Sequence, residues 1–130
     1  MNAVSAMKQY RQVSVHSGIM DASPHRLIQM LMEGALEKIA LAKGNMAYNK
    51  IANKGENIGK AIAIIGGLQS SLNKDSGGEI AENLSNLYNY MQERLVVANL
   101  RNDESILDEV ASLMVEIKMG WDGIPDKFKN

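Results

Sequence analysis

The chain has 130 residues, 45% of them hydrophobic and 22% charged, and this composition is typical of one globular domain with a substantial core. Its formal net charge of −1 and its few, scattered aromatic residues argue against a nucleic-acid-binding surface. Cysteine is absent, which excludes disulfides, and no apolar run approaches the ~20 residues of a membrane span, so we expect a cytoplasmic protein without a signal peptide or membrane insertion.

The predicted elements are all helical, because apolar residues recur with a period near 3.6 along almost the whole length. Residues 3–13 are predicted to form a short amphipathic segment, followed by a polar stretch over 14–21. The first long helix is expected to start at Ser23-Pro24, since serine caps free amides and proline suits the first helical position. Its predicted core stripe consists of Ile28, Leu31, Ala35, Ile39, Ala42 and Met46. A flanking apolar stripe consists of Leu27, Met30, Gly34 and Leu41.

A second long helix is predicted after Tyr48-Asn49-Lys50, ending near Leu72. Its predicted inward residues are Ile51, Ile58, Ile62, Ile65 and Leu72. A neighbouring stripe consists only of small residues: Ala52, Gly55, Gly59, Ala63, Gly66 and Ser70. Each glycine inside a helix costs about 0.5–1 kcal/mol relative to alanine, so the stripe needs a compensating role. It either allows close packing within the bundle or forms a shallow trough for an outside helix.

The third helix is predicted over residues 80–101, after a polar turn at 73–78. Its predicted core face is Ile80, Leu84, Leu87, Met91, Leu95 and Ala98. A second, semi-polar stripe follows the same helix: Asn83, Asn86, Tyr90, Arg94, Val97 and Arg101. Amides, an aromatic ring and guanidinium groups are typical of a protein or peptide contact. The alternative is that this stripe packs against the fourth helix or the N-terminal segment.

The fourth helix is predicted to be capped by Asn102 or Asp103 and to end before Pro125. Its predicted inner face is Ile106, Val110, Leu113, Ile117 and Trp121. Four helices of this length with short connections predict an all-α, antiparallel four-helix bundle. We expect a single domain in which residues 1–21 are an N-terminal cap and linker, 22–121 the bundle and 122–130 a tail.

Residues that could support catalysis or cofactor binding are sparse. Neither His16 nor His25 has partners at metal-binding spacing, and a phosphorelay role for His25 lacks the lysine and glycine that should follow it. The carboxylate pairs resemble solvated helix surfaces: Glu33 with Glu37, and Asp108 with Glu109. No glycine-rich phosphate loop follows a strand. We therefore expect no enzyme, no cofactor and no metal.

Three stretches, in this order, resemble the FliS family of flagellar secretion chaperones. The first is the run from Ala22 through Ser23-Pro24-His25-Arg26 to Leu31. The second runs from Ile58-Gly59 to Gly66-Gly67-Leu68, and the third is Asn83-Leu84-Ser85-Asn86-Leu87-Tyr88-Asn89-Tyr90-Met91, continuing to Asn99. The resemblance extends from about Tyr10 to Trp121, which is nearly the whole chain, and it implies a four-helix bundle with a displaceable N-terminal cap.

The resemblance also implies a partner, the C-terminal region of flagellin, which in this family wraps around the bundle and folds in part as it binds. An export-gate component is a further candidate partner, and the free protein is expected to be a monomer or a weak homodimer. Tyr10 matches the family's N-terminal tyrosine, so the predicted cap residues are Met7, Tyr10 and Val13. The predicted flagellin-binding residues are Asn83, Asn86, Tyr90, Arg94 and Val97 with Gly55, Gly59, Ala63 and Gly66. The alternative function is a structural, homodimeric four-helix adaptor.

Overall fold

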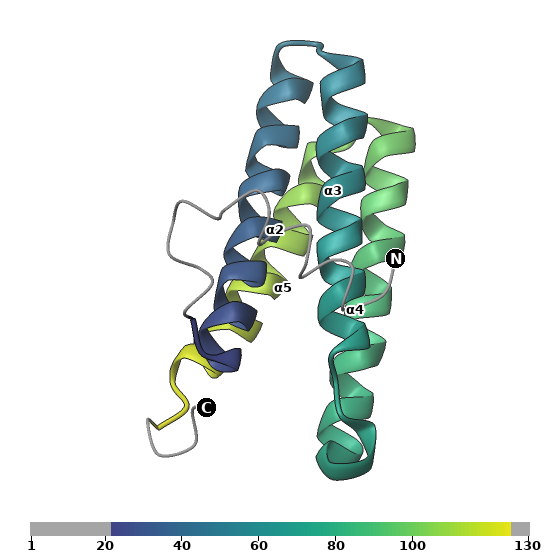
Figure 1. Cartoon of the computed structure of the whole chain (residues 1–130). Coiled ribbons are helices and arrows are strands. Elements are labelled where there is room, and N and C mark those ends of the chain that lie inside the picture. Colours follow the sequence, from purple (N-terminus) through teal and green to yellow (C-terminus); the bar gives the residue numbers. More distant parts are fainter. Residues whose placement is uncertain (1–21, 126–130) are drawn as a thin grey trace.

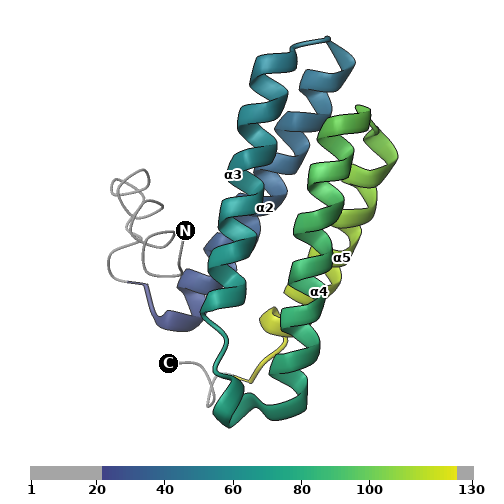
Figure 2. The same ribbon diagram turned by 90° about the vertical axis from the view of Figure 1, so that its right-hand side faces the viewer.

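The computed structural model describes residues 22–125, which fold into four α-helices (Figure 1). They are α2 (Pro24–Ala47), α3 (Ile51–Ser70), α4 (Lys74–Arg101) and α5 (Glu104–Asp122). Both α2 and α4 pack against α3 and against α5, so the helices form a ring around one core. Successive helices run in opposite directions (Figures 1 and 2). The predicted all-α, antiparallel four-helix arrangement is therefore confirmed for the described residues.

The helix ends coincide with the predicted capping residues. The side chain of Ser23 accepts a hydrogen bond from the amide of Arg26 at 3.1 Å, with Pro24 in the first turn. Asn102 ends α4 in the left-handed conformation, at φ 52° and ψ 46°. Asp103 begins α5 by accepting from the amide of Ser105 at 2.9 Å. The connection between α4 and α5 is thus very short, which keeps these two helices side by side.

The predicted turn at residues 73–78 is in fact the first part of α4. Asn73 caps it by accepting from the amide of Ser76 at 3.2 Å, so helical structure begins at Lys74. The helix then breaks at Gly78, which has φ 55° and ψ −131°, a conformation that favours glycine. Gly78 was predicted to end the turn, but it is the site of a kink inside a longer helix.

Half of the predicted inward residues lie in the core cluster, and two of the others, Ile80 and Ile51, are exposed. Ile80 is 79% exposed, because it follows the kink, in a part of α4 whose residues 75–80 are all exposed. On α4 the buried aromatic residue is Tyr88, only 2% exposed, and this burial raises the pKa of its hydroxyl to about 12. The residues of the core cluster are Leu31, Met32, Ala35, Ile39, Ala42, Ile58, Ala61, Ile65, Leu68, Tyr88, Met91, Leu95, Ala98, Ile106, Leu107, Val110 and Met114.

Ile51 was also predicted to point inward, yet its side chain is 68% exposed. Lys54, one turn later, is buried instead, and its ammonium donates to the backbone oxygen of Asn99 at 3.1 Å and to Oδ1 of Asn102 at 3.0 Å. Because these partners lie at the very end of α4, the α3 residues before Lys54 extend past the last turn of that helix. Lys54 also satisfies a carbonyl that the end of α4 would otherwise leave without an internal partner.

The remaining predicted inward residues lie at the edge of the core rather than in it. Ile28, Met46, Ile62, Leu72, Leu84, Leu87, Leu113, Ile117 and Trp121 are partly buried and pack against the core cluster. In the flanking stripe of α2, Leu27 and Gly34 are buried, but Leu41 is 45% exposed. No helix within residues 22–125 is both long and apolar enough to cross a membrane.

Candidate functional site

The predicted semi-polar stripe of α4 divides into two halves. In the half nearer the C-terminus of α4, the hydroxyl of Tyr90 donates to Oε2 of Glu109 on α5 at 2.7 Å. Nε of Arg94 donates to the other oxygen of the same carboxylate, Oε1, at 2.9 Å. Val97 is partly buried against the core. This half therefore packs against α5, as one of the two sequence interpretations allowed.

The pKa values around Glu109 follow from this shared carboxylate. The hydrogen bond from Tyr90 and then that from Arg94 lower the pKa of Glu109 below its ordinary 4.5. The hydrogen bond to the same carboxylate raises the pKa of the Tyr90 hydroxyl, because the bond holds the proton on the hydroxyl. Glu109 was interpreted only as part of a solvated surface, because the sequence does not show which helix it faces.

The other half of the α4 stripe has no such neighbour. Asn83 and Asn86 are exposed, and neither side chain makes a hydrogen bond within residues 22–125. These two amides are therefore available to a molecule outside the described residues. The predicted residues thus share one face by their spacing, but in its second half the polar groups of Tyr90 and Arg94 are bound to Glu109, and Arg101 alone of that half is exposed without such a partner in residues 22–125.

Other described residues leave much of the small-residue stripe of α3 uncovered. A methyl group added at Gly55 or at Gly59 would meet no other group within 4 Å. At Gly66 it would meet the side chain of Gln92 on α4, with Oε1 at 3.3 Å. Close packing within the bundle, one of the two predicted explanations, therefore applies at Gly66 and does not apply at Gly55 or Gly59 among the described residues. Ala63 is partly buried beside them.

Glutamine side chains form the seam between α3 and α4 next to Gly66. Gln69 donates to the backbone oxygen of Ser85 at 2.9 Å, and Gln92 donates to Oε1 of Gln69 at the same distance. This network fixes the side of α4 that borders the α3 stripe. Since Gln92 and Tyr90 are two residues apart, they point about 200° apart around the helix. The structure therefore does not bring the two predicted stripes into one groove but places them on different faces.

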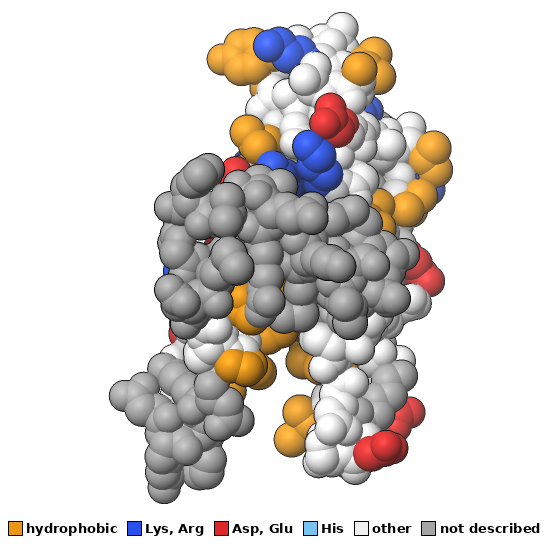
Figure 3. Space-filling view, in the orientation of Figure 1, with side chains coloured by type: hydrophobic (Ala, Val, Ile, Leu, Met, Phe, Trp, Pro, Cys, Tyr) orange, Lys and Arg blue, Asp and Glu red, His pale blue; other side chains and the backbone are white. Residues whose placement is uncertain are grey.

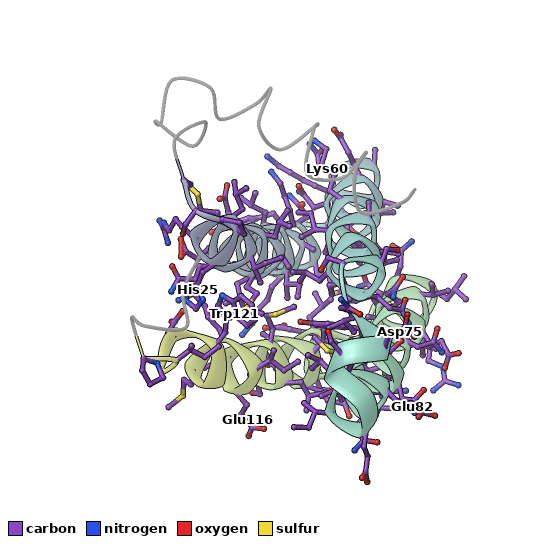
Figure 4. The ribbon with its side chains drawn as sticks, turned by 60° about the horizontal axis from the view of Figure 1, so that its bottom comes forward. His25, Lys60, Asp75, Glu82, Glu116 and Trp121 are labelled. Atoms are coloured by element: carbon purple, nitrogen blue, oxygen red, sulfur yellow. The ribbon has the colours of Figure 1, made fainter. Side chains whose placement is uncertain are left out.

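His25 and Trp121 join the start of α2 to the end of α5. The two rings stack with centroids 4.7 Å apart and an interplanar angle of 9°, and Nε1 of Trp121 donates to the backbone oxygen of His25 at 2.9 Å. Figure 4 labels both residues at this end of the bundle. The His25 side chain is buried, at 6% exposure, and its ring belongs to the contact between α2 and α5. A buried ring is also poorly placed for phosphoryl transfer.

A polar cluster surrounds this ring pair. Asp122 accepts from Lys118 at 2.6 Å and from Gln29 at 2.7 Å. The hydrogen bond from Lys118 is the main reason that the pKa of Asp122 lies below its ordinary value. The cluster holds α2 and α5 together at this end, and its residues belong to the scaffold rather than to either predicted stripe.

Of the other predicted functional residues, the cap residues Met7, Tyr10 and Val13 and the linker residue His16 lie outside residues 22–125. Within the described residues, no three histidine or acidic side chains are grouped so that they could hold a metal ion. Two predicted surfaces are left uncovered by the rest of the described chain: the small-residue face of α3 at Gly55 and Gly59, and the amide pair of α4. Both suit contact with another polypeptide better than chemistry on a small molecule.

Comparison with known proteins identifies the family. The sequence model of the family described as "Flagellar protein FliS" matches residues 6–127. Flagellar secretion chaperone FliSB of Pseudomonas aeruginosa is 57% identical over 124 residues, which cover 95% of this chain and 98% of the relative. Flagellar secretion chaperone FliS of Salmonella typhimurium is 46% identical over 98% of this chain and 95% of its own length. Flagellar secretion chaperone FliS of Vibrio cholerae is 43% identical over 96% of this chain and 92% of its own length. The chain therefore belongs to the FliS family.

Proposed function

We propose that this protein is a cytoplasmic export chaperone that binds the C-terminal region of flagellin. By holding that region it prevents premature polymerisation and assists delivery to the flagellar export apparatus. The observation that carries the proposal is the family membership, since relatives that align over nearly the full chain are named flagellar secretion chaperones. The helical bundle and its uncovered faces are consistent with a protein whose work is binding.

We assign the main contact to the uncovered part of the α3 stripe, at Gly55 and Gly59. An approaching helix can lie close to the α3 backbone here, because no side chain and no neighbouring helix of the described chain fills the space. The helix-propensity cost of these glycines is then offset by contact area gained on binding. Asn83 and Asn86 add hydrogen-bonding groups on a second face of the bundle.

Because these faces point in different directions, the proposed client is an extended segment and not a single short helix. A segment that wraps around the bundle orders as it binds, and its loss of conformational entropy must be compensated by a large contact area. Contacts on several faces supply that area without any one deep pocket. Tyr90 and Arg94 contribute indirectly in this account, since their polar groups bind Glu109.

Isothermal titration of the full-length protein with the purified C-terminal segment of flagellin tests the proposal. We expect heat release and a complex with defined stoichiometry at micromolar concentrations. A negative heat-capacity change should accompany it, because apolar surface is buried. No heat and no stoichiometric complex at these concentrations would refute the proposed function.

The N-terminal cap is tested separately, because it lies outside the described residues. If Tyr10 covers the client surface, then Tyr10→Ala changes the affinity for the flagellin segment and leaves the melting temperature nearly unchanged. A large loss of stability instead would assign Tyr10 to the core. Thermal denaturation and titration of the same preparation distinguish these results.

A further inference from the structure

The two ends of the bundle differ in the charges that they leave unpaired. At the end where α3 begins and α4 ends, Lys50 and Arg101 are exposed and form no ion pair within residues 22–125. The nearby acidic residues of α5, Glu104 and Asp108, are both paired with Lys43 of α2, at 3.6 and 2.8 Å. Asp103, the cap of α5, also lies at this end, and its carboxylate accepts hydrogen bonds from the amide and the hydroxyl of Ser105. Lys50 and Arg101 therefore remain cations that form no ion pair within the described residues.

A third cation lies just beneath these two. Lys54 is buried between the start of α3 and the end of α4, and its ammonium is bound there by two neutral oxygens, from Asn99 and Asn102. Neither oxygen carries a full negative charge, so the positive charge of Lys54 adds to the field at the surface above it. These hydrogen bonds also place the first turn of α3 next to the last turn of α4.

The same end exposes large apolar side chains. Tyr48 is 80% exposed, Ile51 68% and Leu100 79%. Figure 3 shows hydrophobic and basic side chains at the top of the molecule, where the α2–α3 connection lies (Figure 1). Cations and apolar groups therefore share one surface. We call this surface the basic end: Tyr48, Lys50, Ile51, Leu100 and Arg101.

The start of α4, at the opposite end, is acidic on balance, with three carboxylates and one lysine, Lys74, in residues 74–82. Asp75, Glu79 and Glu82 are exposed and form no ion pair within the described residues. Among them stands Ile80, the exposed residue that follows the kink at Gly78. In Figure 4 Asp75 and Glu82 project from α4 on the side away from His25 and Trp121. We call this segment the acidic arm: Asp75, Glu79, Ile80 and Glu82.

The acidic arm cannot neutralise the basic end of its own molecule. Ile80 and Leu100 belong to the same helix and are separated along it by about 30 Å, at 1.5 Å per residue. The Debye length is only about 8 Å at physiological ionic strength, so the two ends do not interact within one molecule. Each end therefore carries a charge and an exposed apolar group whose complement is present at the opposite end of another copy.

We propose that the acidic arm of one copy docks on the basic end of a second copy, so that the protein associates reversibly head to tail. Ile80 contacts the exposed apolar residues of the basic end, and the carboxylates of the arm face Lys50 and Arg101. The contact is heterologous, because different surfaces meet, and it extends into short chains of copies. It is weak and sensitive to salt, since both surfaces are small and exposed. This association does not depend on flagellin binding.

Sedimentation velocity of the full-length protein, without flagellin, tests the proposal. We expect the average mass to rise with concentration at ~0.01 M salt and the association to disappear at ~1 M salt, where the Debye length falls to about 3 Å. The variant Lys50→Glu/Arg101→Glu and the variant Glu79→Lys/Glu82→Lys should each associate at least roughly tenfold more weakly, because like charges then meet. Circular dichroism checks that both remain helical.

An equimolar mixture of these two variants gives the decisive result, because their reversed ends are complementary to each other. We expect the mixture to associate more strongly than either variant does alone. Glu37→Lys, a charge reversal on an exposed residue in the middle of α2, is the matched control and should associate as the wild type does. A wild type that stays monomeric at ~0.01 M salt would overturn the proposal, and so would association that the charge reversals leave unchanged.

Discussion

The α3 and α4 stripes have similar helical spacing and are differently placed in the folded chain. On α4, Tyr90 and Arg94 bind a carboxylate of α5, so half of that stripe belongs to the bundle itself. On α3, Gly55 and Gly59 have no neighbouring helix or side chain of residues 22–125 against them. Spacing shows that residues share a face, but only the neighbouring helix determines whether that face is occupied. The α3 face is therefore the stronger candidate for binding a partner.

The largest effect should come from the side of α4 that faces the core. Replacing Tyr88 by alanine removes a buried ring and should destabilise the protein by about 3–5 kcal/mol. Tyr90→Ala, two positions away, removes a surface ring with one hydrogen bond and should cost only a small fraction of that. Chemical denaturation of both variants measures the contrast. Equal losses would show that the α4 stripe is part of the core.

The α3 face should respond to substitution with the opposite sign. Gly59→Ala should stabilise the protein by about 0.5–1 kcal/mol, because helix propensity improves and the new methyl group meets no neighbour among residues 22–125. Gly44→Ala on α2 is the matched control, since that position is equally open, and it should give a similar gain. The denaturant concentration at the midpoint of unfolding measures both changes in stability, provided that the dependence of the unfolding free energy on denaturant concentration is the same for each variant. A loss of stability for Gly59→Ala alone would mean that the α3 face is packed.

A smaller effect should come from pH. The stability that Glu109 contributes by binding Tyr90 and Arg94 should depend on pH. The pKa of Glu109 is lowered by folding, so its contribution to stability is complete above its ordinary value of 4.5 and is lost as pH falls through the folded pKa. The difference in melting temperature between wild type and Glu109→Gln should therefore shrink as the solution is acidified below 4.5. A difference that does not change with pH would mean that the charge of Glu109 contributes nothing.

Much of the fold could be predicted from the sequence, because helix ends and apolar periodicity are local properties. Ser23-Pro24 and Asp103 cap helices where their chemistry predicts. The errors occur where a helix extends past its neighbours. Ile51 and Ile80 have the right period for the core, but the first is at the start of α3 and the second follows the kink of α4. Periodicity contains no information about the length of the adjacent helix.

The candidate site was less predictable for a related reason. The resemblance indicated which stretches matter, but the division of the α4 stripe depends on Glu109, a residue of another helix. The same holds for Lys54, which was not among the predicted residues and which closes the end of α4 by two hydrogen bonds. Contacts between distant positions depend on the relative rotation of packed helices, and a single sequence does not encode that rotation in any local pattern.

The central claim is that the uncovered α3 face binds the C-terminal region of flagellin, and one pair of variants tests it most directly. Titrate the flagellin segment into Gly59→Leu and into its control Gly44→Leu, after confirming that both melt close to the wild type. We expect Gly59→Leu to bind at least about tenfold more weakly, because the leucine fills the space that the client needs, and Gly44→Leu to bind normally. Equal affinity of the two variants would contradict the account.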